Sequence, residues 1–258
     1  MCKEIIMNKR QEKIVEILKE QGEVSIHQLA LVLNVSEMTI HRDAALLEKQ
    51  DLLYKKRGAL NYAEPSARTK NSQHMREHEK RAIARTTLTL IEDADSIIFD
   101  NSTTALEVAK LLANWKKKNK KLTVYATNLE VANAVCKNPD ITLYVSGGYY
   151  LSSTTGFVGS ITEEFVERIH ADKCVIGISG ISSKYGLTGP YTHHSTLERK
   201  IIAAAKEVIV VADHTKFGKV ALEKVADLAE VDYIVTDAKV SQETVEEFAG
   251  KTKLLIAT

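Results

Sequence analysis

Polar residues and glycines recur where the apolar runs in the second part of the sequence end. Asp100 follows the run SIIF, Thr127 follows LTVYA, and Asp213 follows EVIVVA. Because ligands of open α/β sheets bind beyond the carboxyl ends of the strands, these positions predict one shared ligand site. The candidate residues are Asp100, Asn101, Ser102, Thr103, Thr104, Thr127, Asn128, Gly147, Gly148, Gly180, Asp213 and Lys216.

These residue types suit a phosphorylated and hydroxylated small molecule. The hydroxyls and amides of residues 101–104 lead into a helical pattern, and a helix N-terminus favours an anion. Lys216 supplies a counter-charge for a phosphate, and Asp100 and Asp213 accept hydrogen bonds from hydroxyl groups. Gly147 and its neighbour let the backbone approach a ligand. A helix cap, an ordinary turn and a surface lysine are the plainer explanations, but the recurrence at successive strand ends favours a site.

A second polar cluster lies near the N-terminus, in VSEMTIHRDAALLEKQ. Ile40, Ala44 and Leu47 share one face of a helix, and polar side chains occupy the other. Arg42 is suited to the edge of a guanine or to a phosphate, whereas Asp43 is predicted to pair locally with a cation. A plain amphipathic helix with a solvated face is the alternative. The residues predicted to contact DNA, in this helix and in the basic hairpin after it, are Ser36, Thr39, His41, Arg42, Lys55, Lys56 and Arg57.

The preceding segments supply the elements that a recognition helix needs. One helix is predicted to end at Gly22, and Ser25 with Gln28 forms the capping box of the next. Asn34 marks a tight turn before the third helix, and LLYKK and ALNYA flank a hairpin turn. Three helices and a hairpin in this order predict a winged helix-turn-helix domain over residues 1–62.

The rest of the chain follows a different pattern. Residues 63–79 are polar and are predicted to be a linker. Over residues 80–258, apolar strands such as KCVIGISG alternate with helical patterns such as TALEVAKLLANW. This alternation predicts an α/β domain with a mainly parallel sheet that is buried on both faces.

The stretch VSEMTIHRDAALLEKQDLLYKKRGAL resembles the DNA-binding signature of the DeoR family of bacterial sugar-operon regulators, usually VSxxTIRRDLxxLExxGxLxRxHGGA. It matches at Val35, Ser36, Thr39, Ile40, Arg42, Asp43, Leu47, Glu48, Gly58 and Ala59. It differs at His41 and Arg57, where the family has an arginine and a glycine, and at Ala44, where it has a leucine. IIFDNSTTALEVAKLL, TVYATNLEVANAV, LYVSGG, ADKCVIGISGI and VADHTKFG are similar to the family's C-terminal sensor domain, whose fold is similar to that of ribose-5-phosphate isomerase.

The resemblance implies a DNA-binding repressor of a carbohydrate-metabolism operon that a phosphorylated sugar releases from operator DNA. It implies no catalytic residues, no cofactor and no metal. Paired half-sites imply a homodimer or homotetramer. Ser102, where the family often has glycine, and Ser195, where it usually has glutamate, leave open a different effector or a degenerate site. A sugar-phosphate isomerase with an appended DNA-binding domain is the alternative, and a constitutive DNA-binding protein is a third possibility.

Composition bounds these predictions. The net charge of +1 gives no global basic field, so DNA contacts must come from a local patch. The three cysteines are far apart and form no CxxC pair, which is typical of a reduced compartment. The sequence has no apolar run near the ~20 residues of a membrane span and no signal-peptide pattern, so a cytoplasmic protein that does not contact membranes is expected.

Overall fold

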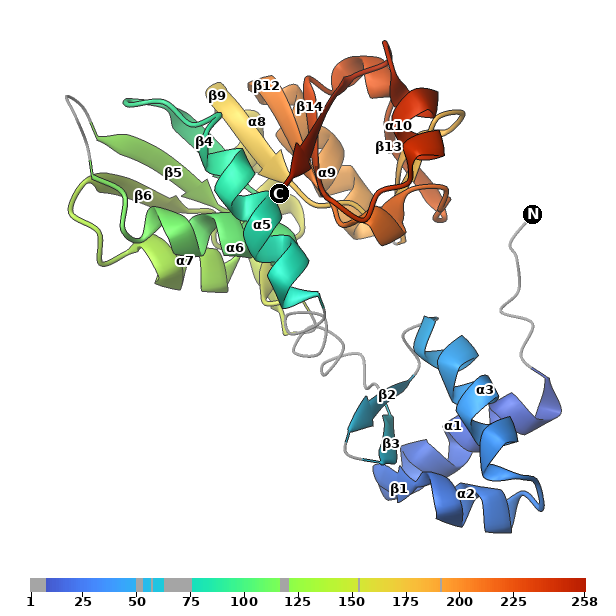
Figure 1. Ribbon diagram of the computed structural model, residues 1–258. Coiled ribbons are helices and arrows are strands. Elements are labelled where there is room, and N and C mark those ends of the chain that lie inside the picture. The colour runs from blue at the N-terminus through green and yellow to red at the C-terminus, as the bar shows by residue number, and fades with distance from the viewer. Residues whose placement is uncertain are drawn as a thin grey trace. The chain divides into compact units, whose positions relative to one another are not determined.

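The computed structural model describes residues 8–49, 53–56, 58–62, 76–116, 121–152, 154–190 and 192–258 (Figure 1). The chain divides into two compact units, residues 1–72 and 73–258. The first helix of the second unit, α5 (Glu77–Leu88), begins inside the segment predicted to be a linker. Within the described residues, no helix is long and apolar enough to cross a membrane.

The N-terminal unit has three helices and a small antiparallel sheet. The helices are α1 (Lys9–Gln21), α2 (Ile26–Val32) and α3 (Glu37–Lys49). The predicted hairpin is confirmed as β2 (Leu53–Lys56) and β3 (Ala59–Tyr62), and β1 (Glu23–Ser25) adds a third strand in the order β1-β3-β2. This is the predicted winged helix-turn-helix arrangement.

Local signals fix where these helices begin. Asn8 forms a capping box with Gln11, and Ser25 forms the predicted one with Gln28. Gly22 ends α1 with a φ of 77°, a conformation that favours glycine. The helices then meet over one apolar core, whose fully buried members include Ile14, Leu18, Leu29, Ile40, Leu47 and Leu60.

The C-terminal unit is built on a seven-stranded parallel sheet in the order β15-β14-β12-β9-β4-β5-β6. The strands are β4 (Ser96–Phe99), β5 (Leu122–Ala126), β6 (Ile141–Val145), β9 (Ala171–Ile176), β12 (Ala205–Val211), β14 (Tyr233–Asp237) and β15 (Lys253–Ala257). The prediction of a mainly parallel sheet is confirmed. β15 was not foreseen and forms one edge.

Both faces of the sheet are covered, as predicted. Ile97 and Phe99 of β4 point into the core beneath α5, α6 (Thr103–Leu112) and α7 (Leu129–Val135). Ile98 points to the opposite face, which packs under α8 (Ser160–Glu167), α9 (Thr192–Ala203) and α10 (Gln242–Phe248). Such burial on both faces requires strands that are apolar along their whole length.

The strand order contains a switch point between β4 and β9. The chain runs outward from β4 through β5 to β6, then returns to place β9 on the other side of β4. The return passes through the hairpin of β7 (Tyr149–Leu151) and β8 (Gly156–Val158). A crevice at such a point, beyond the carboxyl ends of the strands, is the usual ligand position in this class of sheet.

The remaining elements are short. A second small sheet contains β10 (Gly180–Ser182), β11 (Gly186–Gly189) and β13 (Glu223–Ala226). Two 3₁₀ turns, η1 (His214–Lys216) and η2 (Leu228–Glu230), follow β12 and β13. η1 lies just beyond the carboxyl end of β12 and therefore at the edge where the ligand site is predicted.

Candidate functional site

The outward face of α3 carries an arginine, a histidine and an apolar side chain. Ile40, Ala44 and Leu47 are fully buried, as predicted. On the other side, His41 and Arg42 are exposed, and Met38 is 74% exposed. Because Met38 precedes Arg42 by four residues, the two side chains lie on one stripe of the helix. Sequence reasoning missed Met38, since a methionine in a helical pattern is usually a core residue.

The first turn of α3 is held by its own polar residues. The Oγ of Ser36 accepts the N–H of Thr39 at 3.3 Å and lies 2.9 Å from the Thr39 hydroxyl. Glu37 Oε1 lies 2.8 Å from Nδ1 of His27 and links the start of α3 to α2. Ser36 and Thr39 therefore hold the beginning of the helix that presents Arg42.

Asp43 points the other way, into the N-terminal unit. It is 3% exposed, and its carboxylate accepts hydrogen bonds from Arg10 Nε at 2.5 Å and Gln11 Nε2 at 3.2 Å. The predicted local pairing of Asp43 is therefore confirmed, with an arginine of α1 as its partner. With the acid turned inward, the outer face of α3 keeps the positive charge of Arg42.

The hairpin supplies one described cation. Lys55 is exposed on β2, and its backbone N–H donates to Glu48 Oε1 at 3.2 Å, which ties the strand to α3. Arg57 and the side chain of Lys56 lie outside the described residues.

At the switch point, Asp100 joins the ends of two neighbouring strands. It is 4% exposed, and its two carboxylate oxygens accept the N–H of Ser102 at 3.0 Å and of Gly177 at 2.9 Å. Burial raises the pKa of Asp100 to about 6, against the effect of these hydrogen bonds. Ser102 in turn caps α6, since its Oγ accepts the N–H of Ala105 at 3.1 Å.

The side-chain amides of Asn101 and Asn128 differ in their hydrogen bonding. Asn101 Oδ1 lies 3.0 Å from the Thr127 hydroxyl, whereas Nδ2 of Asn101 is buried without a hydrogen-bond partner in the described part of the chain. Asn128 caps α7 through Oδ1 and donates from Nδ2 to the carbonyl of Thr154 at 3.0 Å. The Asn128 side chain thus makes its hydrogen bonds within the protein, whereas the Asn101 amide keeps an N–H donor that no described residue accepts.

Two of the predicted glycines are packed against protein atoms, so that a side chain at either position would overlap its neighbours. A Cβ on Gly148 would overlap the hydroxyl of Thr162, which donates to the Gly147 carbonyl at 2.8 Å. A Cβ on Gly180 would lie 2.6 Å from Thr188 Oγ1. Close packing therefore accounts for these two glycines without a ligand. A Cβ on Gly147 would meet nothing within 4 Å, but its φ of 64° favours glycine.

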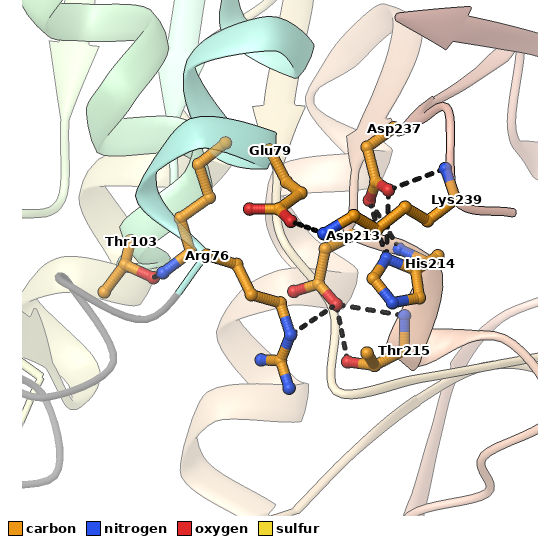
Figure 2. A network of polar contacts seen from close by, with 9 residues as sticks. Arg76, Glu79, Thr103, Asp213, His214, Thr215, Asp237 and Lys239 are labelled. Atoms are coloured by element: carbon orange, nitrogen blue, oxygen red, sulfur yellow. Dashed lines mark hydrogen bonds and ion pairs between the residues drawn. The ribbon is translucent and has the colours of Figure 1, made fainter.

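Asp213 anchors the turn beyond β12. It is 2% exposed, its Oδ1 accepts the N–H of Thr215 at 3.0 Å, and Arg76 Nε approaches it at 3.7 Å (Figure 2). Burial opposes ionisation, but the hydrogen bond from Thr215 and the charges of Lys216 and Arg76 lower the pKa of Asp213. Asp213 is therefore an ionised acid held between cations.

A buried lysine that sequence reasoning missed lies in the same place. Lys80 of α5 is 4% exposed and donates from Nζ to the hydroxyl of Thr103 at 2.9 Å. Burial lowers the pKa of Lys80 to about 8, and the charges that act on it include Asp213, Lys216 and Arg76. We call Arg76, Lys80 and Lys216 the cation cluster. Thr103 belongs to the first turn of α6, so the cluster lies at a helix N-terminus.

A polar network positions α5 over this edge of the sheet. The Asp237 carboxylate at the end of β14 accepts the backbone N–H of His214 at 2.8 Å and lies 2.9 Å from the His214 ring. Lys239, two residues further on, forms an ion pair with Glu79 of α5 (Figure 2). Glu79 is one residue before Lys80, so this pair fixes the turn of α5 that carries the buried lysine.

Both units match known domains. Residues 75–238 match the profile described as DeoR C terminal sensor domain, and residues 10–66 match the DeoR-like helix-turn-helix domain. The chain belongs to the DeoR family. The resemblance seen in the sequence is therefore confirmed, and this DeoR-family protein is a DNA-binding transcriptional regulator with a sensor domain.

Curated relatives extend over nearly the whole chain. The glycerol-3-phosphate regulon repressor of Escherichia coli is 33% identical and covers 89% of this chain and 90% of its own. The repressor GlcR of Bacillus subtilis is 31% identical over 87% and 86%, and the regulator GolR of Listeria innocua is 29% identical over 93% and 94%. These relatives are transcriptional regulators.

Among solved structures, ribose 5-phosphate isomerase A from Methanocaldococcus jannaschii is similar to 55% of this chain, over 54% of its own length. The sequence identity is 16% and the TM-score is 0.40.

Proposed function

We propose that this DeoR-family regulator represses a carbohydrate-metabolism operon and that a phosphorylated sugar, bound at the strand-end edge of the sensor domain, releases it from operator DNA. The names of relatives support this proposal. One is a glycerol-3-phosphate regulon repressor, and another is a putative aga operon transcriptional repressor.

The cation cluster is the observation that carries the proposal. Burial disfavours the charged form of Lys80 and lowers its pKa to about 8, whereas a nearby negative charge favours the ammonium form. A phosphate beside Lys80 would compensate that charge, with Arg76 and Lys216 as further donors and the N–H groups at the start of α6 as neutral ones. The phosphate would thus occupy the space between α5, α6 and η1.

The sugar would then extend toward the switch point. We assign hydroxyl recognition to Asp100 and Asn101, because Asn101 has an unused donor and both precede the helix at the phosphate position. Thr104, Thr127 and Gly147 remain candidates for contacts with the same sugar hydroxyls. Asn128, Gly148 and Gly180 would act by shaping the loops, because their own contacts are internal.

The proposed domain roles follow the sequence prediction with one change. Residues 1–62 would bind DNA and residues 80–258 would bind the effector. Because Arg76 would contact the phosphate, the segment that links the two functions would end before it, rather than at residue 79.

On DNA, the exposed stripe of α3 would enter the major groove. Arg42 would take a guanine edge or a phosphate, His41 would lie beside it, and Met38 would make apolar contact with a thymine methyl. Ser36 and Thr39 would orient the helix and approach the backbone. Lys55 and the predicted hairpin residues Lys56 and Arg57 would contact phosphates.

Two such helices are needed to read two half-sites, so we propose that the functional form is a homodimer or homotetramer. Sedimentation of the full-length protein with and without operator DNA tests this proposal. A monomer in both samples would contradict it.

The effector test uses thermal stability and operator binding together. We expect one or more sugar phosphates to raise the melting temperature, since saturating ligand stabilises the native state by mass action. The same compound should weaken operator binding several-fold to about a hundredfold in fluorescence anisotropy at fixed salt. Unphosphorylated sugars should do neither.

Two variants localise the effect. Lys216→Ala should abolish the response to sugar phosphates, while Lys251→Ala, which changes an exposed lysine on another part of the unit, should not. A full response in the Lys216 variant would move the phosphate site elsewhere. Turnover of a sugar phosphate by the wild-type protein would instead support the isomerase alternative. No response to any compound would reject effector sensing.

A further inference from the structure

Buried polar atoms without hydrogen-bond partners gather at the strand-end edge of the sensor domain. Six such side-chain atoms occur among the described residues, and three of them are Nδ2 of Asn101, Oγ of Ser195 and Oε2 of Glu198. Leaving a buried polar group unpaired is unfavourable, so a cluster of such atoms in a native protein calls for a bound group that pairs them.

The course of the chain brings these residues to one edge. α9 leads directly into β12, so its C-terminal end lies at the beginning of that strand. The first turns of α9, which carry Ser195 and Glu198, must therefore lie toward the carboxyl ends of the strands, where Asn101 follows β4. Ser195 and Glu198 are three residues apart and so share one face of the helix.

The glycines nearby show how close the elements come. Gly189, at the end of β11, has no side chain, and a Cβ there would overlap Ser195 Oγ and lie 3.1 Å from Glu198 Oε2. A Cβ on Gly156 of β8 would overlap the side chain of Asn101. Both glycines thus leave room for polar side chains, and each of these side chains has one buried atom without a hydrogen-bond partner in the described protein.

The charges at this edge favour a hydroxylated ligand. Burial and the nearby Asp100 carboxylate together raise the pKa of Glu198 to about 8, against the charge of Arg199, so the Glu198 carboxyl keeps its proton at neutral pH. A protonated carboxyl both donates and accepts, as does the Ser195 hydroxyl. Sugar hydroxyls also do both, and they would satisfy these groups together with the donor of Asn101.

We propose that Ser195 and Glu198 form a hydroxyl-binding wall that selects the carbon chain of the effector, while the cation cluster holds its phosphate. This inference rests on the proposed function. It adds two ligand-contacting residues from α9 and assigns separate roles to the two groups of residues. The cation cluster sets affinity for phosphate, and the wall sets the preference for a sugar phosphate over phosphate alone.

The test compares inorganic phosphate with a panel of hexose 6-phosphates, pentose 5-phosphates and glycerol 3-phosphate on the full-length protein. For each variant, the quantity measured is the ratio of the dissociation constant for inorganic phosphate to that for the tightest sugar phosphate. Ser195→Ala removes one oxygen, and Glu198→Met replaces the carboxyl with an apolar group of similar size. Glu164→Met, at an exposed position on α8, is the matched control.

We expect Ser195→Ala to lower the ratio about fivefold and Glu198→Met to lower it about tenfold or more, while the affinity for inorganic phosphate stays within about twofold. Both variants should also raise the melting temperature of the ligand-free protein, because each removes an unpaired buried polar group. A residue that only supports the fold would give the opposite shift. The Glu164 control should leave the ratio unchanged.

Other results would overturn the inference in distinguishable ways. An unchanged ratio in both variants, with phosphate still bound and still lost in Lys216→Ala, would reject the wall and leave the proposed phosphate site intact. An equal loss of phosphate and sugar phosphate, with a lower melting temperature, would make the two residues structural. A wild-type protein that binds none of the compounds would reject both the wall and the proposed function. If Glu198→Met does not fold, the Ser195 variant decides by itself.

Discussion

Binding of a phosphorylated effector should protonate Lys80. Burial lowers the pKa of this lysine to about 8, so only about one quarter of the molecules carry the proton at pH 8.5. A phosphate dianion next to Nζ stabilises the ammonium form and returns the pKa toward the ordinary value of 10.5. At pH 8.5 the complex should therefore take up as much as about 0.75 proton, and at pH 7 only about 0.1.

Calorimetry measures this uptake directly. The sugar phosphate found in the thermal screen is titrated at pH 8.5 in two buffers of different ionisation enthalpy, and the difference in binding enthalpy gives the number of protons. Lys80→Arg keeps the positive charge but cannot lose it, so this variant should bind with little or no uptake. Lys251→Arg is the matched control and should behave as the wild type.

The same lysine should leave a signature in the stability of the ligand-free protein. Below pH 8 the ammonium is buried in the folded state, at a cost of up to about 3 kcal/mol relative to the unfolded chain. Between pH 8 and 10.5 the folded protein sheds this proton first, so this contribution makes the free energy of unfolding rise with pH. Lys80→Met should therefore be more stable than the wild type below pH 8, and the difference should shrink toward pH 10.5.

Two results would refute this reasoning. Tight binding at pH 8.5 without proton uptake would mean that the phosphate does not lie beside Lys80. Equal uptake in the wild type and in Lys80→Arg would place the titrating group elsewhere.

Three further substitutions test the remaining contacts. Arg42→Ala should weaken operator binding by about 1–3 kcal/mol in gel shifts at fixed salt with an unchanged circular dichroism spectrum, and unchanged affinity would remove Arg42 from the interface. Asp43→Ala should lower the free energy of unfolding by about 2 kcal/mol in urea, because it removes the acceptor of the buried Gln11 amide and of Arg10; a neutral result would show that this pairing is not needed for stability. Gly177→Ala should lower the melting temperature, since the new Cβ would overlap Ser102, and Ser102→Gly in the same chain should recover part of the loss; equal losses with and without it would contradict the steric account.

The sequence by itself determined most of the secondary structure and the class of protein, although it predicted neither β15 nor the start of α5. Capping residues such as Ser25 and the apolar spacing of Ile40, Ala44 and Leu47 are local signals, and local signals suffice to place short helices. Strands buried on both faces need continuous apolar runs, which is why the parallel sheet could be predicted. The inward pairing of Asp43 also followed, because an acid on a DNA-facing surface would be repelled by phosphate.

The tertiary structure decided which side chains meet and which are already used. Lys80 and Asp213 are 133 positions apart in the numbering, and they interact only because α5 crosses the sheet beside the end of β12. The sequence marks Ser195 only as a departure from the family pattern, and the fold buries its Oγ and Oε2 of Glu198 without hydrogen-bond partners in the described part of the chain. The sequence predicts Asn128 and Asn101 equally as ligand contacts. In the structure, Asn128 caps a helix and donates to a backbone carbonyl, whereas Asn101 keeps a donor that no described residue accepts. Burial and hydrogen-bond satisfaction depend on contacts between distant segments, so no local pattern contains them.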